Sequence, residues 1–553
     1  MAVTVARVGP AALDPRARQA MVPMRDGVRL ATDLYLPEGP GPFPTVLVRL
    51  PYDKNGRYCW MPFLATHVIA RGYAFVPQDV RGRFRSEGEP VAFVNEVADG
   101  YDTIEWIVRQ PWSNGDVGMW GDSYYGFTQW AAVAARHPAL KAIVPRVTIA
   151  DIDSWLDGVT PLYGAHYLGE FWTDHDTHEW TPDWTRRPLA EVFDDGFAAI
   201  GRRSASFDHV LARSRGGVRV ELYPDGHPFD ALRIPTLHGV GWFDNITPAH
   251  MLDYEALMRN PETAPFQYLH AGSTDHENYR FDCVPIAESD DHGRHDDALA
   301  RMLPGYIGPA LDFFDAFLAE RSDPATVPRA RWHLPHVGWQ DSPTWPPADA
   351  SELRLYLADP ERAGADAQGG SLAAAPDDRG EASWLHDPDD LVPSTLVNPF
   401  AALYEYPDER EVESRPDVMT FTTRGWDEPV TLAGRVVAHL EVSSDAPSLF
   451  LHVKLVDVRP DGRAHTLLFG QLVHEPLPGT VAEVYLGHTG FRVEPDHRLR
   501  LHVAASDFPV YLPHPGTAEN AWDATATQTN RQTLVTVGAM PSYLSLTART
   551  ATT

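Results

Sequence analysis

Apolar and polar residues alternate near the start of the chain, and further on apolar residues gather into short continuous runs. Between residues 21 and 36 the alternation on both sides of Asp26-Gly27 predicts a β-hairpin. Continuous runs are typical of strands buried on both faces, and they cover residues 45–50, 74–77, 117–120, 142–145, 235–241 and 267–272. Helical patterns at 101–108 and 124–135 separate some of these runs. We therefore expect a mostly parallel α/β sheet.

The alternation of strands and helices stops between residues 149 and 232, where the chain is rich in aromatic residues and loops. An insertion at this point would lie over the carboxyl ends of the strands, where open α/β sheets bind ligands. We interpret it as a cap. Its aromatic side chains are Trp155, Tyr163, Tyr167, Phe171, Trp172, Trp180 and Trp184.

The last 200 residues have a different pattern, with short strands, turn residues between them and no long helical period. Predicted strands include 353–357, 430–434, 436–442, 450–456 and 499–504, which favours an all-β sandwich of the jelly-roll type. The Gly, Ala and Asp residues of 364–380 predict a surface loop. The predicted domains are an α/β core formed by 1–148 and 233–348, a cap of 149–232, and a β domain of 349–553.

Composition narrows the classes of function. The 553 residues include 46 basic and 76 acidic side chains, a formal net charge of −30 that repels nucleic acid and anionic membranes. The cysteines Cys59 and Cys283 are too few for a disulfide framework or a four-thiolate metal site. Residues 1–13 lack a signal-peptide pattern, and no run approaches 18 apolar residues. We expect a cytoplasmic protein without a cofactor.

The segment from Gly118 to Gly126 carries the main candidate for chemistry. It predicts a strand, a tight turn at Ser123 and a helix, the arrangement that exposes a nucleophilic serine at a helix N-terminus. Its pattern is G-x-S-x-x-G, because Tyr125 occupies the position of the second glycine in the commoner G-x-S-x-G turn. Taken alone, a Gly-Ser turn of this kind is equally compatible with packing.

Two further residues follow predicted strands. Asp244 lies just beyond the strand at 235–241, and His276 lies in the loop after 267–272. The order Ser, Asp, His is the chain order of α/β-hydrolase triads. His270 and His292 are the nearest alternatives for the base. The run His175-Asp176-Thr177-His178-Glu179 could suggest a metal, but no spaced partner cluster accompanies it, so we expect none.

Several motifs together resemble the family of cocaine esterase and X-prolyl dipeptidyl-peptidase, which are serine hydrolases. The motifs extend over most of the chain. They are Met24 to Tyr35, Arg49-Leu50-Pro51-Tyr52-Asp53-Lys54, Asp79-Val80-Arg81-Gly82 with Ser86-Glu87-Gly88, Gly121-Asp122-Ser123-Tyr124-Tyr125-Gly126, Arg415-Pro416-Asp417-Val418, and Lys454 to Val458 with Pro460-Asp461-Gly462. Ala271 to His276 departs from the family's Gly-Pro-Trp-x-His.

The resemblance implies an α/β-hydrolase core, a helical cap and a C-terminal jelly-roll domain. It also implies that Ser123 attacks a carbonyl, His276 transfers the proton and Asp244 orients His276. The Tyr52 hydroxyl and the Tyr124 backbone N–H would bind the oxyanion. We expect a small ester or amide substrate with an apolar group, because aromatic residues surround the predicted site. They are Trp120, Trp155, Phe171, Trp172, Trp242 and Phe243.

Other functions remain open at this stage. An X-prolyl dipeptidyl aminopeptidase needs an acidic group for the substrate amine, and the sequence places none. An α-amino-acid ester hydrolase is disfavoured, because Asn245-Ile246-Thr247 follow Asp244 where such enzymes carry carboxylates. An acyltransferase and a non-catalytic carbohydrate-binding protein are the remaining alternatives. The resemblance also makes a homodimer through the β domain plausible.

Overall fold

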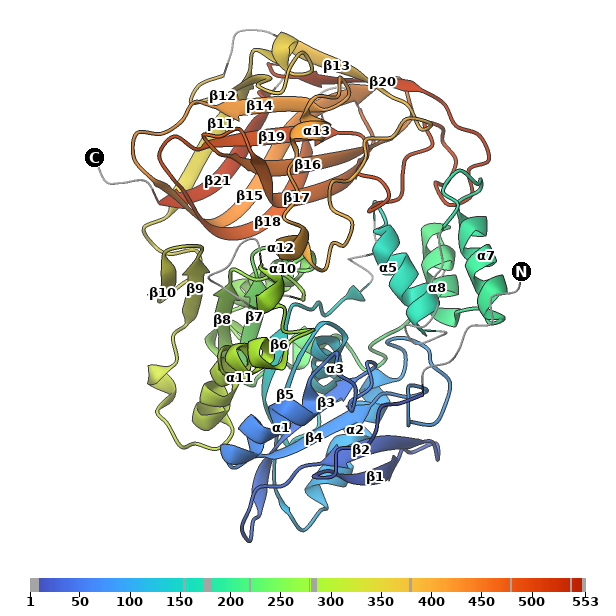
Figure 1. Ribbon diagram of the computed structural model, residues 1–553, viewed down its shortest axis with the longest axis vertical. Coiled ribbons are helices and arrows are strands. Elements are labelled where there is room, and N and C mark those ends of the chain that lie inside the picture. Colours follow the sequence, from blue (N-terminus) through green and yellow to red (C-terminus); the bar gives the residue numbers. More distant parts are fainter. Residues whose placement is uncertain are drawn as a thin grey trace.

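The computed structural model describes residues 9–152, 156, 158–172, 182–217, 220–277, 279, 286–376, 380–477, 480–537 and 540–549. In this part of the chain the strands form two sheets (Figure 1). The first sheet belongs to the α/β core, and the second to the β domain that Figure 1 draws in yellow to red. Among the described residues no helix is both long and apolar enough to cross a membrane.

The core sheet has a parallel centre and antiparallel edges. Its order is β1-β2-β4-β3-β5-β6-β7-β8-β9-β10, and the neighbours from β4 to β9 are parallel. The predicted hairpin and the six predicted runs are confirmed. The strands are β1 (Arg18–Pro23), β2 (Arg29–Leu34), β3 (Phe43–Leu50), β4 (Ala74–Asp79), β5 (Ser113–Asp122), β6 (Leu140–Arg146), β7 (Thr236–Gly241), β8 (Gln267–Gly272), β9 (Ala330–Leu334) and β10 (Gly338–Ser342).

Helices cover both faces of this sheet. Successive residues of β3 point to opposite faces, so Val46 and Val48 pack with α1 and α11, whereas Leu47 packs with α2 and α3. This two-sided burial explains why the central strands read as continuous apolar runs. The helices are α1 (Met61–Ala70), α2 (Glu96–Val108), α3 (Ser123–Ala134), α10 (Thr247–Arg259) and α11 (Asp296–Phe317).

The cap is helical and contacts both the core and the β domain. Its helices are α5 (Leu162–His166), the π-helical turn η1 (Tyr167–Phe171), α7 (Ala190–Ile200), α8 (Ala205–Ser214) and α9 (Pro228–Ala231). Leu162 N donates to Val510 O of the β domain at 2.9 Å, and Ser206 Oγ of the cap accepts a hydrogen bond from Ala92 N of the core at 2.9 Å. The cap is therefore held between the other two parts (Figure 1).

The β domain packs its strands around an apolar core of its own, as predicted for a sandwich. Two expectations were wrong in detail. The predicted loop at 364–380 contains β12, where Gly370 allows a close approach because a Cβ there would lie 2.7 Å from Ala358 O. The predicted strands at 430–434 and 436–442 are one strand, β15, with an irregular register after Leu432.

The strands of this domain are β11 (Ser351–Ala358), β12 (Gly370–Ala373), β13 (Glu381–His386), β14 (Met419–Thr423), β15 (Val430–Ser444), β16 (Leu449–Val458), β17 (Ala464–His474), β18 (Ala482–Val493), β19 (Arg498–Ala504), β20 (Asn530–Val535) and β21 (Tyr543–Arg549). The short helices α12 (Ala402–Glu405) and α13 (Arg410–Glu413) lie between β13 and β14 in the chain. Figure 1 shows α12 on the side of the β domain that faces α10 of the core.

Candidate active site

Ser123 occupies a strained turn between β5 and α3. Its φ of 52° lies in the left-handed region, which a non-glycine residue adopts at a cost, and such strain is concentrated at functional sites. Two glycines make the turn possible. A Cβ at Gly121 would lie 2.1 Å from Tyr125 Cδ2, and a Cβ at Gly126 would lie 2.6 Å from the Thr148 side chain. The second glycine of the motif thus permits α3 to pack closely against Thr148.

The loops after β7 and β8 bring Asp244 and His276 together. His276 Nδ1 lies 2.8 Å from Asp244 Oδ2, and both residues are buried. Burial by itself disfavours the charged imidazole, but the Asp244 carboxylate outweighs it and raises the pKa of His276 above its ordinary value. Asp244 Oδ1 also accepts a 2.7 Å hydrogen bond from Ile246 N, which holds the carboxylate in place.

Ser123 and His276 line one cavity of about 260 Å³ together with Tyr52 and Tyr124. The remaining lining is largely apolar and comes from Tyr58, Phe93, Phe127, Thr148, Ile149, Ile152, Tyr167, Phe171, Ile246 and Phe400. A second cavity of about 240 Å³ also contains Ser123, His276 and Tyr52, and its lining includes the acidic residues Asp122, Glu277 and Asp291. We name these the apolar cavity and the acidic cavity. The serine and the histidine lie where the two cavities meet.

Two tyrosines stand beside the serine. Burial raises the pKa of Tyr52, so its phenol stays protonated and can act as a donor, while hydrogen bonds with Tyr167 and Ser123 act in the opposite direction. The Tyr124 hydroxyl is already engaged, because it donates to Glu96 Oε1 at 2.8 Å and accepts from Phe93 N at 2.8 Å. The backbone N–H of Tyr124 belongs to the first turn of α3, where amide groups have no partner within the helix.

Comparison with known proteins agrees with this geometry. Residues 26–278 match the family model of X-Pro dipeptidyl-peptidase (S15 family), and residues 323–545 match that of the X-Pro dipeptidyl-peptidase C-terminal non-catalytic domain. A cocaine esterase from Rhodococcus sp. is 33% identical, and the alignment covers 90% of this chain and 91% of that protein. The chain belongs to the cocaine esterase family of serine hydrolases.

Solved structures agree on the architecture of this family member. An alpha-amino acid ester hydrolase matches with a TM-score of 0.78 and 25% identity, and 98% of each chain is covered. An aminopeptidase from a marine sediment archaeon, Thaumarchaeota archaeon, matches with a TM-score of 0.77 and 23% identity over 98% of each chain. Because the sequence identity to the aminopeptidase is so low, that match supports the fold alone. An α/β core with a C-terminal β-sandwich is thus confirmed, and the protein is a serine hydrolase enzyme.

The aromatic residues expected around the substrate lie in several different places. Phe171 lines the apolar cavity, with its ring centre 5.3 Å from that of Tyr52. Trp172 and Trp120 lie behind the cavity wall instead, since they are fully buried and pack against Tyr124 and Tyr306 respectively. Trp155 and the segment from His175 to Glu179 lie outside the described residues.

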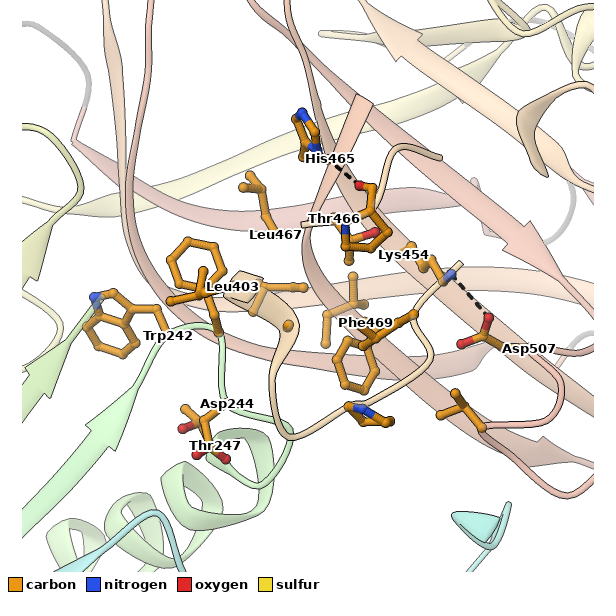
Figure 2. A pocket seen from close by; sticks show the side chains of 18 of the residues that line it. Trp242, Asp244, Thr247, Leu403, Lys454, His465, Thr466, Leu467, Phe469 and Asp507 are labelled. Carbon is orange, nitrogen blue, oxygen red and sulfur yellow. Dashed lines mark hydrogen bonds and ion pairs between the residues drawn. The ribbon is translucent and has the colours of Figure 1, made fainter. Parts of the chain in front are cut away.

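Trp242 and Phe243 face the β domain rather than either of these two cavities. They line a small space of about 60 Å³ between the core and the β domain, together with Lys454 and His465 (Figure 2). Trp242 stacks on Trp345 with ring centres 5.1 Å apart, and its Nε1 donates to His333 O at 2.9 Å. These two contacts hold Trp242 within the core, whereas Phe243 packs against the apolar core of the β domain. The aromatic residues after β7 therefore lie at the interface of the two parts, although they are close to Asp244 in sequence.

Phe400, which reaches the site from the β domain, was not predicted from the sequence. Its ring centre lies 5.0 Å from that of His276, and Glu277 N donates to Phe400 O at 3.1 Å. No local pattern around Asn398-Pro399-Phe400 could reveal this contact, because 124 positions separate the two rings along the chain.

Of the alternative bases, His270 packs against Trp339, and His292 lines the acidic cavity next to Trp60.

Proposed function

We propose that this serine hydrolase is a carboxylesterase in which Ser123, His276 and Asp244 form the catalytic triad. The observation that carries the proposal is the 2.8 Å hydrogen bond between His276 and Asp244, in a pair whose histidine lines the same cavity as the strained Ser123. Nucleophile, base and orienting acid are the three parts that acyl transfer needs. The order of the three residues in the chain supports the same assignment.

In the proposed reaction, Ser123 Oγ attacks the ester carbonyl carbon while His276 Nε2 takes the hydroxyl proton. Asp244 stabilises the imidazolium through Nδ1–H. The Tyr52 hydroxyl and the Tyr124 backbone N–H donate to the carbonyl oxygen, which becomes negatively charged. The alcohol leaves with the proton from His276, and the acyl group remains on Ser123. Water then gives a proton to His276 and attacks the acyl carbon. His276 returns that proton to Ser123 Oγ as the acid leaves.

The substrate class is inferred from the apolar cavity. Phe93, Phe127, Phe171 and Phe400 supply flat apolar surface there, and the volume of about 260 Å³ suits a small aromatic or branched aliphatic group. We propose a small ester with such a group on one side of the scissile bond. Esters with larger apolar groups should therefore react faster than the matching acetate.

The test is hydrolysis of a series of p-nitrophenyl esters by the wild type and by Ser123→Ala. Intact-mass detection of the adduct with a fluorophosphonate probe is measured alongside. We expect turnover and labelling in the wild type and neither above background in the folded variant. Labelling that persists in Ser123→Ala would contradict the assignment of Ser123 as the nucleophile. No labelling of folded wild type would favour a binding protein.

Removal of X-Pro dipeptides is a second candidate, favoured by one observation. Such an enzyme needs an acidic group for the free amine of its substrate, and Glu277 and Asp291 line the acidic cavity beside Ser123. The family model matched by residues 26–278 carries the same activity in its description. Comparing Ala-Pro-p-nitroanilide with p-nitrophenyl benzoate distinguishes the two, since the esterase proposal expects kcat/KM to favour the ester.

A further inference from the structure

We propose that Tyr167 of the cap is a positioning residue for the oxyanion donor Tyr52. Its hydroxyl donates to the Tyr52 oxygen and leaves the Tyr52 proton free to point at the substrate carbonyl. The inference rests on the proposed function, in which Tyr52 stabilises the oxyanion. It extends that function, because it makes the cap part of the oxyanion-binding machinery as well as a cover for the cavity.

The contact between the two tyrosines carries the proposal. Their hydroxyl oxygens lie 3.0 Å apart, and both side chains line the apolar cavity. A phenol has one proton, so only one member of the pair can donate to the other. If Tyr167 donates, Tyr52 accepts through a lone pair and keeps its own proton for the substrate. Hydrogen bonds in such a chain strengthen one another, which would make Tyr52 a better donor as negative charge develops.

The electrostatic surroundings favour this direction. Burial raises the pKa of both phenols, but the bond between them acts to lower the pKa of Tyr52 and to raise that of Tyr167. Tyr52 also has Ser123 and the Arg83 guanidinium near it, and both favour its charged form. Negative charge is therefore better stabilised on the Tyr52 oxygen than on the Tyr167 oxygen, so Tyr167 is the donor of the pair as the Tyr52 oxygen gains charge during catalysis.

The fold fixes the separation of the two hydroxyls through one buried arginine. Arg83 Nε donates to Pro51 O at 3.1 Å, directly before Tyr52, and Arg83 Nη1 donates to Phe171 O at 2.8 Å in η1. Its guanidinium also lies over the Phe171 ring at 4.3 Å. One fully buried side chain therefore holds both the loop that carries Tyr52 and the turn that carries Tyr167.

The π-helical turn η1 aligns the donor. Tyr167 and Phe171 stack with ring centres 5.0 Å apart and planes 15° apart, and Phe171 in turn contacts Tyr52. Single π-helical turns are rare and often occur at functional sites. Here the turn presents the Tyr167 hydroxyl and the Phe171 ring to the same neighbour, so the orientation of Tyr167 is fixed by stacking as well as by its hydrogen bond.

The test is a double-mutant cycle with Tyr52→Phe, Tyr167→Phe and the double variant, assayed with a p-nitrophenyl ester. We expect Tyr52→Phe to lower kcat about 10²-fold. Tyr167→Phe should lower kcat about tenfold with KM unchanged, a size typical of coupled groups in one network. The double variant should be no slower than Tyr52→Phe alone. Affinity for phenylboronic acid, which forms a tetrahedral adduct with a nucleophilic serine, should fall in step with kcat.

The matched control is Tyr223→Phe, which removes the hydroxyl of another partly buried tyrosine, one that donates to Ala150 O. It should leave kcat, KM and boronate affinity unchanged. If Tyr167→Phe costs the same factor with and without Tyr52→Phe, its role is structural and the inference is overturned. If Tyr52→Phe alone is costly but Tyr167→Phe is neutral, only this inference fails. If Tyr52→Phe is neutral, the proposed oxyanion role of Tyr52 fails, and the inference fails with it.

Discussion

Replacing Gly126 by alanine tests how precisely the turn at Ser123 must be held. The added Cβ would lie 2.6 Å from both Cβ and Cγ2 of Thr148, whereas non-bonded carbon atoms rest about 3.5–4.0 Å apart. The two side chains must therefore separate by roughly 1 Å. Thr148 is 2% exposed, and its Oγ1 donates to Ser123 O at 2.7 Å, so it cannot move away without also moving Ser123.

The expected loss follows from this displacement. Misplacing a reacting group by about 1 Å can cost about 10²-fold in rate, and overpacking of this kind typically costs about 1–3 kcal/mol of stability. We expect Gly126→Ala to lower kcat/KM for a p-nitrophenyl ester about 10²-fold and to slow fluorophosphonate labelling by a similar factor. The folded state should persist, as judged by circular dichroism.

Two further variants make the result interpretable. Gly305→Ala adds the same methyl group to an exposed position of α11 with no atom within 4 Å, and it should leave the rate unchanged. Thr148→Ser, introduced into Gly126→Ala, removes Cγ2 but keeps the hydroxyl that bonds Ser123 O, so it should restore part of the activity. A Gly126→Ala enzyme as fast as the wild type would refute the reasoning, because the close packing at Thr148 would then not position the serine.

The remaining predictions concern charge. Burial lowers the pKa of His276, whereas the charges of Asp244, Asp122 and Glu277 raise it. The proposed base must be neutral in the free enzyme, so Glu277→Gln, which removes one negative charge, should move the acidic limb of the kcat/KM profile to lower pH. An unchanged midpoint of that limb would contradict this prediction. Lys54→Met should lower stability by about 3–5 kcal/mol, because it leaves the buried Asp79, 2.7 Å from Lys54 Nζ, without its cation. Thermal unfolding should show that adding Asp79→Asn recovers part of that loss, and a full loss in the double variant would argue against the charge as its cause.

Local patterns were sufficient for most of the core. Asp26-Gly27 defines the hairpin because Gly27 adopts a φ of 88° in its turn, and apolar runs identify central strands because both faces are covered. The helix α11 and the strands β9 and β10 were not predicted, although α11 packs against the face of the sheet that carries Val46. Its buried residues recur at helical spacing from Leu299 to Phe314, but Pro304 and Pro309 lie inside the helix, and in the sequence a proline is typical of a helix break.

The candidate site was also predictable only in part. Ser123, Asp244 and His276 could be predicted because each follows a strand, and the carboxyl ends of parallel strands lie at one edge of a sheet. The sequence could not predict which aromatic residues face the cavity. Trp242 and Phe171 are both aromatic residues in segments expected near the site, but they lie in different surroundings. One packs into the interface with the β domain, and the other contacts Tyr52.

The loop that carries His276 departs from the family's Gly-Pro-Trp-x-His pattern, and the structure suggests how its position is maintained. Asp275 Oδ2 accepts a hydrogen bond from Leu403 N at 2.7 Å, and Glu277 N donates to Phe400 O at 3.1 Å. Both neighbours of His276 are thus bonded to the same segment of the β domain, and the Phe400 ring lies against the imidazole. A domain described in the family as non-catalytic therefore helps to define the position of His276, so substitutions in 396–406 should alter ester hydrolysis although they do not contact Ser123.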